Sequence, residues 1–190
     1  MLLQVTGPNG CGKTSLLRII CGLLSPERGE IRWQGAEIRS LDEEYFRSIT
    51  YIGHRIAVKE ELNSLENLRI SSGLSGYSLS RDQAQKALAQ VGLGGREYLP
   101  VRFLSEGQRR RSALARLIDC TAILWILDEV LASLDAAAVT LVESLISEHL
   151  SNGGMAIVAT HQELQISAGT FQRLQLEPPV SGGTALGSPS

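Results

Sequence analysis

The sequence predicts an α/β fold built on a parallel β-sheet. Short apolar runs typical of buried strands alternate along the chain with segments that have helical periodicity. A glycine-rich turn at 7–15 joins the first expected strand to the first expected helix, and two carboxylates directly follow a later strand. Loops that follow parallel strands gather at one edge of a sheet, so both features are expected there.

The first elements follow from local patterns. Residues 2–5 predict a short strand, and the turn after it leads into an apolar helix from Lys13 to about Leu23. The alternating stretch 29–38 contains a central glycine, which predicts a hairpin or edge strands. Residues 48–52 predict another strand.

From residue 54 to about 117 the chain changes to helices and loops. Ser80 and Gln83 form a capping-box pattern, in which each side chain bonds to the backbone of the other residue at the start of a helix. The stretch separates the early strands from the later ones. We therefore expect an inserted α-helical subdomain over about 55–117.

Two buried strands and a helix follow. Residues 122–129 form an apolar run that ends in two carboxylates, and a helix is expected from about Asp135. Residues 155–161 predict one more buried strand, and 171–177 a weak final one. The tail at 177–190 is rich in Pro, Gly and Ser and is expected to be disordered.

Length and composition predict one soluble domain over 1–176. The chain has 190 residues, 43% hydrophobic and 20% charged, which suffices for a sizeable core. A net charge of −2 gives no basic footprint for nucleic acid. Three cysteines without paired spacing favour a reducing, cytosolic compartment. No signal peptide opens the chain, and its longest apolar run, 122–127, is too short to span a bilayer.

The segment GPNGCGKTS matches the phosphate-loop pattern G-x-x-x-x-G-K-[ST]. Its glycines let backbone N–H groups converge on phosphate oxygens, and the helix N-terminus favours an anion; the alternative is a chance glycine-rich turn. Lys13 is expected to reach the β- and γ-phosphates of a nucleotide, and Thr14 to place its hydroxyl on Mg²⁺. The expected nucleotide-binding residues are Gly7, Pro8, Asn9, Gly10, Cys11, Gly12, Lys13, Thr14 and Ser15.

Asp128 and Glu129 supply the second half of a nucleotide site. Asp128 stands at the carboxyl end of an apolar strand and is expected, with Thr14, to bind Mg²⁺. Glu129 is a candidate base that orients or deprotonates the attacking water. An Asp-Glu pair after a strand can also be a solvated loop start, but the phosphate loop on the same sheet favours the nucleotide site.

The segment LSEGQRRR resembles the L-S-G-G-Q signature of the ATP-binding-cassette family and stands between the phosphate loop and the acidic strand, as in that family. The resemblance implies a P-loop NTPase with a RecA-like parallel core. It also implies that Ser105, Gly107 and Gln108 bind the nucleotide held by a second copy. Glu106 replaces a glycine of the signature. Residues 109–111 are interpreted as a solvated helix face.

Three more residues fall at positions of that family. Asp135, which ends LASLD, resembles the D-loop aspartate at the dimer interface, and Val130 replaces a common proline. His161, directly after AIVAT, resembles the switch histidine that contacts the γ-phosphate, although a lone histidine at a strand end is usually incidental. His54 stands where the family has a glutamine that touches Mg²⁺ and water. The resemblance makes Glu129, His161 and His54 the catalytic candidates; contact of His54 with a membrane subunit alone is the alternative.

The stretch YIGHRIAVKEELNSLENL, with GEIRWQGAEI and THQEL, resembles the ATPase subunits of the haem exporter of cytochrome c maturation (CcmA-type). The resemblance covers residues 2 to about 176, and Arg55 departs from a common glutamine. It implies a head-to-tail dimer that sandwiches two ATP molecules. The dimer would lie on the cytoplasmic face of the inner membrane, bound to integral membrane permease subunits. Whether haem itself is moved or a haem-handling chaperone is released stays open.

Members of the family carry antiparallel strands and an adenine-stacking aromatic before the phosphate-loop strand, and this sequence begins within that strand. We therefore expect the 29–38 hairpin to lack sheet partners and ATP to bind weakly. Two alternatives to the haem exporter stay open: a degenerate regulatory module that binds ATP without hydrolysis, and the ATPase of another ABC exporter. A cassette protein of translation or DNA repair is disfavoured, because the chain has one cassette and no basic surface.

Overall fold

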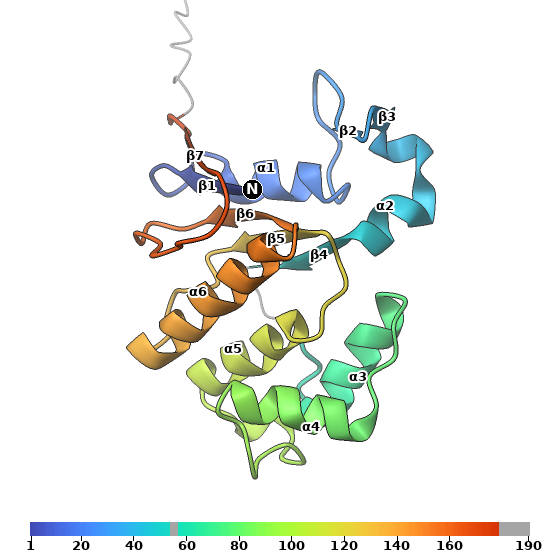
Figure 1. Ribbon diagram of the computed structural model, residues 1–190, viewed down its shortest axis with the longest axis vertical. Helices are drawn as coiled ribbons and strands as arrows, with labels where there is room; N and C mark the ends of the chain where they lie inside the picture. The colour runs from blue at the N-terminus through green and yellow to red at the C-terminus, as the bar shows by residue number, and fades with distance from the viewer. Residues whose placement is uncertain (54–56, 179–190) are drawn as a thin grey trace, which may run out of the picture.

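The computed structural model describes residues 1–53 and 57–178 and contains a five-stranded sheet with helices on both faces (Figure 1). The strands lie in the order β4-β5-β6-β1-β7, and every neighbouring pair is parallel. Their bounds are β1 (Leu2–Thr6), β4 (Ile49–Ile52), β5 (Leu124–Asp128), β6 (Met155–Ala159) and β7 (Phe171–Gln175). The expected α/β fold with a parallel core is therefore confirmed.

The pleat of β5 divides the core between the two faces of the sheet. All five residues of β5 are buried, as expected of a central parallel strand. Ile126 packs with Leu17 of α1 (Lys13–Ile20) in the cluster on one face. Leu127 packs with Ile146 of α6 (Ala136–Ser151) in the cluster on the other. Successive side chains point to opposite faces of a strand, so a continuous apolar run fills both clusters.

A short antiparallel hairpin precedes β4. Strands β2 (Arg32–Trp33) and β3 (Ala36–Glu37) pair with each other alone among the described strands. Gln34 and Gly35 both have positive φ, 50° and 88°, as a two-residue turn of this hand requires. The hairpin expected at 29–38 is thus present, without further strand partners in the described residues.

Helix α2 (Asp42–Ser48) was not expected from the sequence. It joins the hairpin to β4, and among its residues 43–48 Tyr45 alone is buried. The Tyr45 hydroxyl donates a hydrogen bond to the carbonyl oxygen of Ile20 at the end of α1. One anchor in a polar seven-residue segment gives no helical periodicity, which explains why the pattern did not indicate a helix.

Helices α3 (Ser64–Leu74), α4 (Arg81–Gln90) and α5 (Glu106–Leu114) lie together beside the sheet, on the side of α6 (Figure 1). Helices α3 and α4 are built around an apolar cluster that includes Leu68 of α3 and Leu88 of α4, together with Ala115 and Ile118 after α5. Each begins with a capping box, formed by the pairs Asn63–Glu66, Ser80–Gln83 and Ser105–Gln108. The extent of the helical subdomain, about 55–117, stays a prediction.

The last turn of α6 packs against the beginnings of β5 and β6. His149 stacks on Trp125, with ring centroids 4.0 Å apart and an interplanar angle of 8°. Its Nε2 lies 3.1 Å from the carbonyl oxygens of both Ile123 and Met155. A Cβ on Gly154 would come within 2.3 Å of the ring, so a larger residue there would displace the His149 ring. Burial lowers the pKa of His149.

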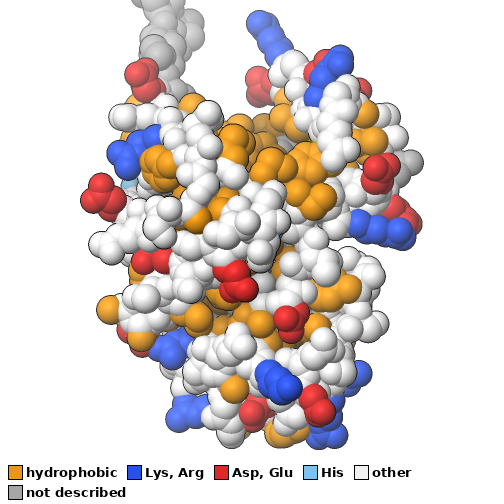
Figure 2. All heavy atoms as spheres, in the orientation of Figure 1, with side chains coloured by type: hydrophobic (Ala, Val, Ile, Leu, Met, Phe, Trp, Pro, Cys, Tyr) orange, Lys and Arg blue, Asp and Glu red, His pale blue; other side chains and the backbone are white. Residues whose placement is uncertain are grey.

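Helix ends and lengths differ a little from expectation. Helix α1 ends at Ile20 and not near Leu23, because Gly22 follows with a φ of 73° that a helix cannot continue. Leu23 and Leu24 are exposed, and Figure 2 shows hydrophobic side chains gathered on the same upper part of the molecule. Within 1–53 and 57–178, no helix is both long enough and apolar enough to cross a membrane.

Candidate functional site

The phosphate loop curls between β1 and the start of α1. Gly7, Gly10 and Gly12 have φ values of 143°, 80° and 101°, which residues with a Cβ rarely adopt. A Cβ on Gly7 would lie 2.5 Å from the carbonyl oxygen of Leu176, directly after β7. The loop therefore depends on glycine both for its curl and for its close approach to the chain after β7.

Lys13, the first residue of α1, collects contacts from three motifs. Its side chain is 7% exposed. Its Nζ donates to the carbonyl oxygens of Gly7 at 2.8 Å and Pro8 at 3.3 Å. The same atom lies 3.1 Å from Nε2 of His161 and 3.7 Å from Oε1 of Glu129. The structure therefore brings the predicted phosphate loop, base and switch histidine together.

Thr14 and Asp128 place two oxygen ligands side by side. Thr14 Oγ1 donates to Oδ1 of Asp128 at 3.3 Å, and Asp128 is fully buried at the end of β5. Tyr51 of β4 lies on the other side, with its hydroxyl 3.5 Å from Oδ2 of Asp128. Burial raises the pKa of Tyr51, so the hydroxyl stays a donor. A hydroxyl and a carboxylate in this arrangement fit the hard-oxygen preference of Mg²⁺.

Glu129 and His161 face each other across the loop. Glu129 follows β5 in a left-handed conformation with a φ of 53°, and its backbone N–H donates to Ala159 at 2.9 Å. Its Oε1 lies 3.4 Å from His161 Nε2, which also lies 3.1 Å from Oδ1 of Asn9. The Glu129 side chain is 22% exposed. Water can therefore reach this carboxylate, as a general base that acts on water requires.

The phosphate loop, the start of α1 and Glu129 line a pocket of about 420 Å³. The pocket is lined by Asn9, Gly10, Gly12, Lys13, Thr14, Ser15 and Glu129. Every lining residue belongs to the phosphate loop or follows the acidic strand. Converging loop donors, one lysine and a partly exposed carboxylate suit a phosphate chain that is to be hydrolysed.

The signature residues lie apart from this pocket. Ser105 and Gln108 bond to each other at the start of α5: Ser105 Oγ accepts from the Gln108 N–H at 3.3 Å, and Gln108 Oε1 accepts from the Ser105 N–H at 3.0 Å. Gly107 packs close to the carbonyl oxygen of Ser133. Ser105, Gly107 and Gln108 do not line the pocket described above. The start of α5 therefore meets the 131–135 loop of its own chain.

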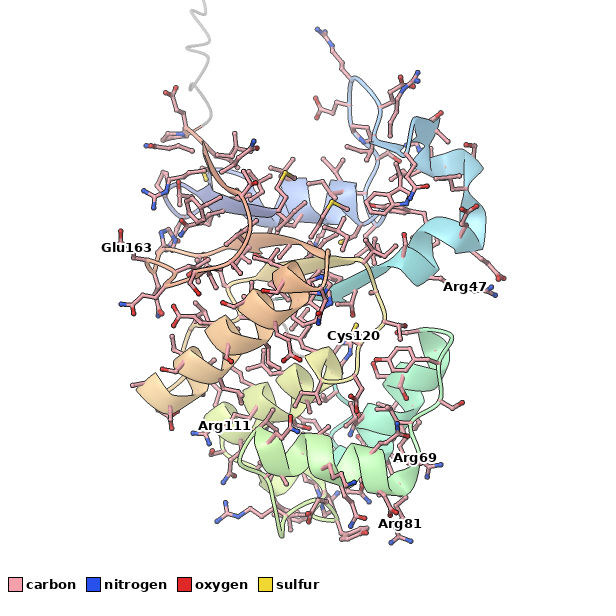
Figure 3. All side chains as sticks on the ribbon, in the orientation of Figure 1. Arg47, Arg69, Arg81, Arg111, Cys120 and Glu163 are labelled. Atoms are coloured by element: carbon pink, nitrogen blue, oxygen red, sulfur yellow. The ribbon has the colours of Figure 1, made fainter. Side chains whose placement is uncertain are left out.

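Asp135 joins two helices. Its Oδ1 accepts from the backbone N–H of Ala138 at 2.9 Å and so caps α6. Its other oxygen pairs with Arg111, which extends from α5 in Figure 3. A carboxylate used in both ways fixes the 131–135 loop between α5 and α6.

The interpretation of residues 109–111 as a solvated helix face is wrong. Arg110 is buried, with 8% of its surface exposed, and its Nη1 donates to the carbonyl oxygen of Glu129 at 3.3 Å. Arg109 pairs with Glu60 at 2.9 Å. The residues meet tertiary partners that a run of arginines in a sequence does not reveal.

One predicted residue cannot be placed, and one residue near Asp128 was missed. His54 lies outside the described residues, so its role stays a prediction. Tyr51 was missed, although it lies on β4 in register with Ile126 of the acidic strand β5. A polar-tipped residue on the strand beside the acidic one is the signal that could have found it.

Comparison with known proteins agrees with this geometry. The profile of the ABC transporter family matches residues 1–132. The chain belongs to the ABC transporter family. Among its ABC transporter relatives, the cytochrome c biogenesis ATP-binding export protein CcmA of Nitrosospira multiformis is 58% identical over 92% of this chain and 85% of that protein. The protein of the same name from Nitrosomonas europaea is 53% identical over 92% and 82%. These identities place the chain among the CcmA-type ABC ATPases.

Solved ABC transporter structures share the fold. A putative ABC transporter ATP-binding protein from Pyrococcus furiosus superposes with a TM-score of 0.76 at 27% identity, over 91% of this chain and 84% of that one. A bacterial ABC transporter cassette solved as a dimer gives a TM-score of 0.80 at 22% identity, over 93% and 81%. The expected P-loop ABC ATPase fold is confirmed.

Proposed function

We propose that the chain is the ATP-hydrolysing subunit of an ABC transporter that serves cytochrome c biogenesis, by haem export or by release of a haem-handling chaperone. One observation carries the hydrolytic part: Lys13 Nζ lies 3.1 Å from His161 and 3.7 Å from Glu129. A phosphate-binding cation, a base and a polar partner thus converge. The names of the CcmA relatives support the biological role.

The phosphate loop holds the triphosphate of ATP. Backbone N–H groups of the loop and the N-terminus of α1 face the phosphates, and Lys13 pairs with the β- and γ-phosphates. Mg²⁺, when bound, neutralises charge that develops on the phosphate oxygens. Thr14 and Asp128 hold it, and Tyr51 orients the Asp128 carboxylate through the contact at 3.5 Å.

Glu129 acts on the attacking water. It accepts a proton from the water or orients it toward the γ-phosphorus, and the bond between that phosphorus and the leaving ADP oxygen breaks. His161 lies beside the carboxylate at 3.4 Å and presents its ring to the γ-phosphate. His54, which follows Gly53 in the sequence, is proposed to assist hydrolysis.

A second copy completes the site. Ser105, Gly107 and Gln108 do not line the pocket of their own chain, so the signature is available to a nucleotide held by another copy. We propose a head-to-tail dimer, with Asp135 near its interface. Integral membrane permease subunits would bind this dimer on the cytoplasmic face of the inner membrane.

Substitution Glu129→Gln tests the hydrolytic function. It removes the base and keeps the size of the side chain, so ATP turnover should fall by about 10²–10⁴-fold while binding of a fluorescent ATP analogue is retained. Glu148→Gln, at an exposed carboxylate on α6, is the matched control and should keep wild-type turnover. Turnover that is absent in the wild-type chain would instead favour the regulatory module that binds ATP without hydrolysis.

Complementation tests the biological role. The chain and its Glu129→Gln variant are expressed in a bacterium that lacks its own CcmA-type ATPase, and covalently haem-stained c-type cytochromes are measured. Restoration by the wild-type chain alone is expected. Failure of an ATPase-active chain to restore them would favour another ABC exporter.

A further inference from the structure

Arg110 is a buried cation with an unusual set of partners. It lies in the second turn of α5 with 8% of its surface exposed, whereas the side chain of Glu106, one turn earlier, is 72% exposed. The distance from Arg110 Nη2 to Glu106 Oε1 is 3.7 Å, so this pair is loose. Within the described part of the chain, Arg110 Nε has no hydrogen-bond partner. Glu106 is therefore a weak partner, and the hydrogen bond of the guanidinium goes to another residue.

That contact is the backbone of the candidate base. Arg110 Nη1 donates to the carbonyl oxygen of Glu129 at 3.3 Å, and the same oxygen accepts from the Ala132 N–H at 3.2 Å. On the other side of the residue, the Glu129 N–H donates to Ala159 of β6 at 2.9 Å. Both peptide groups of Glu129 are thus held by neighbours.

Such restraint matters because Glu129 is strained. Its φ of 53° is left-handed, which costs energy for a residue with a Cβ and persists only where the surroundings enforce it. The carboxylate reaches His161 Nε2 at 3.4 Å and Lys13 Nζ at 3.7 Å from this backbone conformation. Relaxation of the backbone would move the carboxylate away from both.

We propose that Arg110 is a positioning residue for ATP hydrolysis: its guanidinium holds the Glu129 carbonyl, and so keeps the Glu129 carboxylate aimed at the attacking water. The inference rests on the proposed role of Glu129. It also connects the signature helix α5 directly to the base of the same chain. Arg110 itself does not touch nucleotide.

A substitution of Arg110 that keeps the fold distinguishes the positioning role from a purely stabilising one. Removal of the Arg110 charge leaves no buried charge unpaired, because the Glu106 side chain is 72% exposed, and the Glu129 carbonyl oxygen still accepts from the Ala132 N–H. Arg110→Met should therefore fold and bind nucleotide. A misplacement of about 1 Å in a catalytic group can cost about 10²-fold in rate, so the loss should appear in kcat.

The experiment compares ATP turnover of the full chain with Arg110→Met, Arg109→Met and Glu129→Gln. Arg110→Met should lower kcat by about 10–100-fold, with KM for ATP within about threefold and an unchanged thermal unfolding midpoint. Arg109→Met, one position earlier on α5, contacts Glu60 and not Glu129, and should keep wild-type kcat. An Arg110→Met chain that unfolds, loses nucleotide binding or keeps wild-type kcat overturns the proposal.

A double substitution shows whether Arg110 acts through Glu129. Single-turnover hydrolysis of labelled ATP is followed in Glu129→Gln and in Glu129→Gln/Arg110→Met. If Arg110 positions the carboxylate, adding Arg110→Met to Glu129→Gln should lower the single-turnover rate by less than about a further twofold. Multiplied losses would show an independent effect and refute the inference. If Glu129→Gln alone leaves turnover unchanged, the proposed function fails first.

Discussion

Substitution Gly7→Ala should destabilise the fold more than the same change elsewhere in the phosphate loop. The φ of 143° at Gly7 belongs to a region that is essentially restricted to glycine. The new Cβ would also lie 2.5 Å from the Leu176 carbonyl oxygen and 2.7 Å from Cys11 Sγ, whereas ordinary contacts begin at 3.4 Å. The substitution therefore combines backbone strain with a collision against the chain after β7.

Gly10→Ala separates these two costs. Gly10 has a φ of 80°, but a Cβ at this position would meet nothing within 4 Å, so only strain of about 1–2 kcal/mol is expected. For Gly7→Ala, the collision adds about 1–3 kcal/mol of the kind measured for overpacked sites. A companion Cys11→Ala change removes the flexible part of the collision and leaves the contact with Leu176.

Urea unfolding without nucleotide measures both costs. The free energy of unfolding of Gly7→Ala should fall below that of Gly10→Ala by about 1–3 kcal/mol, or about 2–4 °C per kcal/mol in a thermal scan. Gly7→Ala/Cys11→Ala should recover a minor part of the difference. Equal losses in Gly7→Ala and Gly10→Ala would refute the close approach to Leu176.

Three further results are expected. Cys11, partly exposed in the phosphate loop, should react with iodoacetamide more slowly when ATP is bound; equal rates by mass spectrometry would contradict this. Burial lowers the pKa of His149, so the unfolded chain takes up a proton that the folded chain resists; stability should fall as pH drops below about 6.5, and His149→Gln should flatten that slope in urea unfolding. Asp135→Ala removes the cap of α6 and should cost about 1 kcal/mol, more than Asp135→Asn, which keeps a capping oxygen.

The sheet was predictable because its central strands, β5 and β6, consist almost entirely of apolar residues. The runs around β5 and β6 are bounded by carboxylates, glycines or a histidine, so each strand ends near where its sequence pattern ends. Helix α2 was not predictable, because Tyr45 is the one buried side chain among residues 43–48. A single anchor becomes visible only when the end of α1 is in place beside it.

The candidate site likewise contains some residues that the sequence predicts and others that it does not. Lys13, Asp128 and Glu129 occur in patterns whose spacing already implies a common site, and the structure brings them together. The function of Arg110 depends on a contact with a backbone carbonyl 19 positions later, and no local period encodes that. Tyr51 reaches Asp128 only because β4 is the neighbour of β5, which is a matter of strand order.

The stack of His149 on Trp125 makes the chain its own optical reporter. The sequence has two tryptophans, and Trp125 lies three residues before Asp128 on the same strand. An imidazolium ion quenches indole fluorescence more strongly than a neutral imidazole does, and the rings here are 4.0 Å apart. With Trp33→Phe, the remaining emission would come from Trp125 alone. Its intensity would then follow the packing of α6 against the strand that ends in Asp128, without any dye.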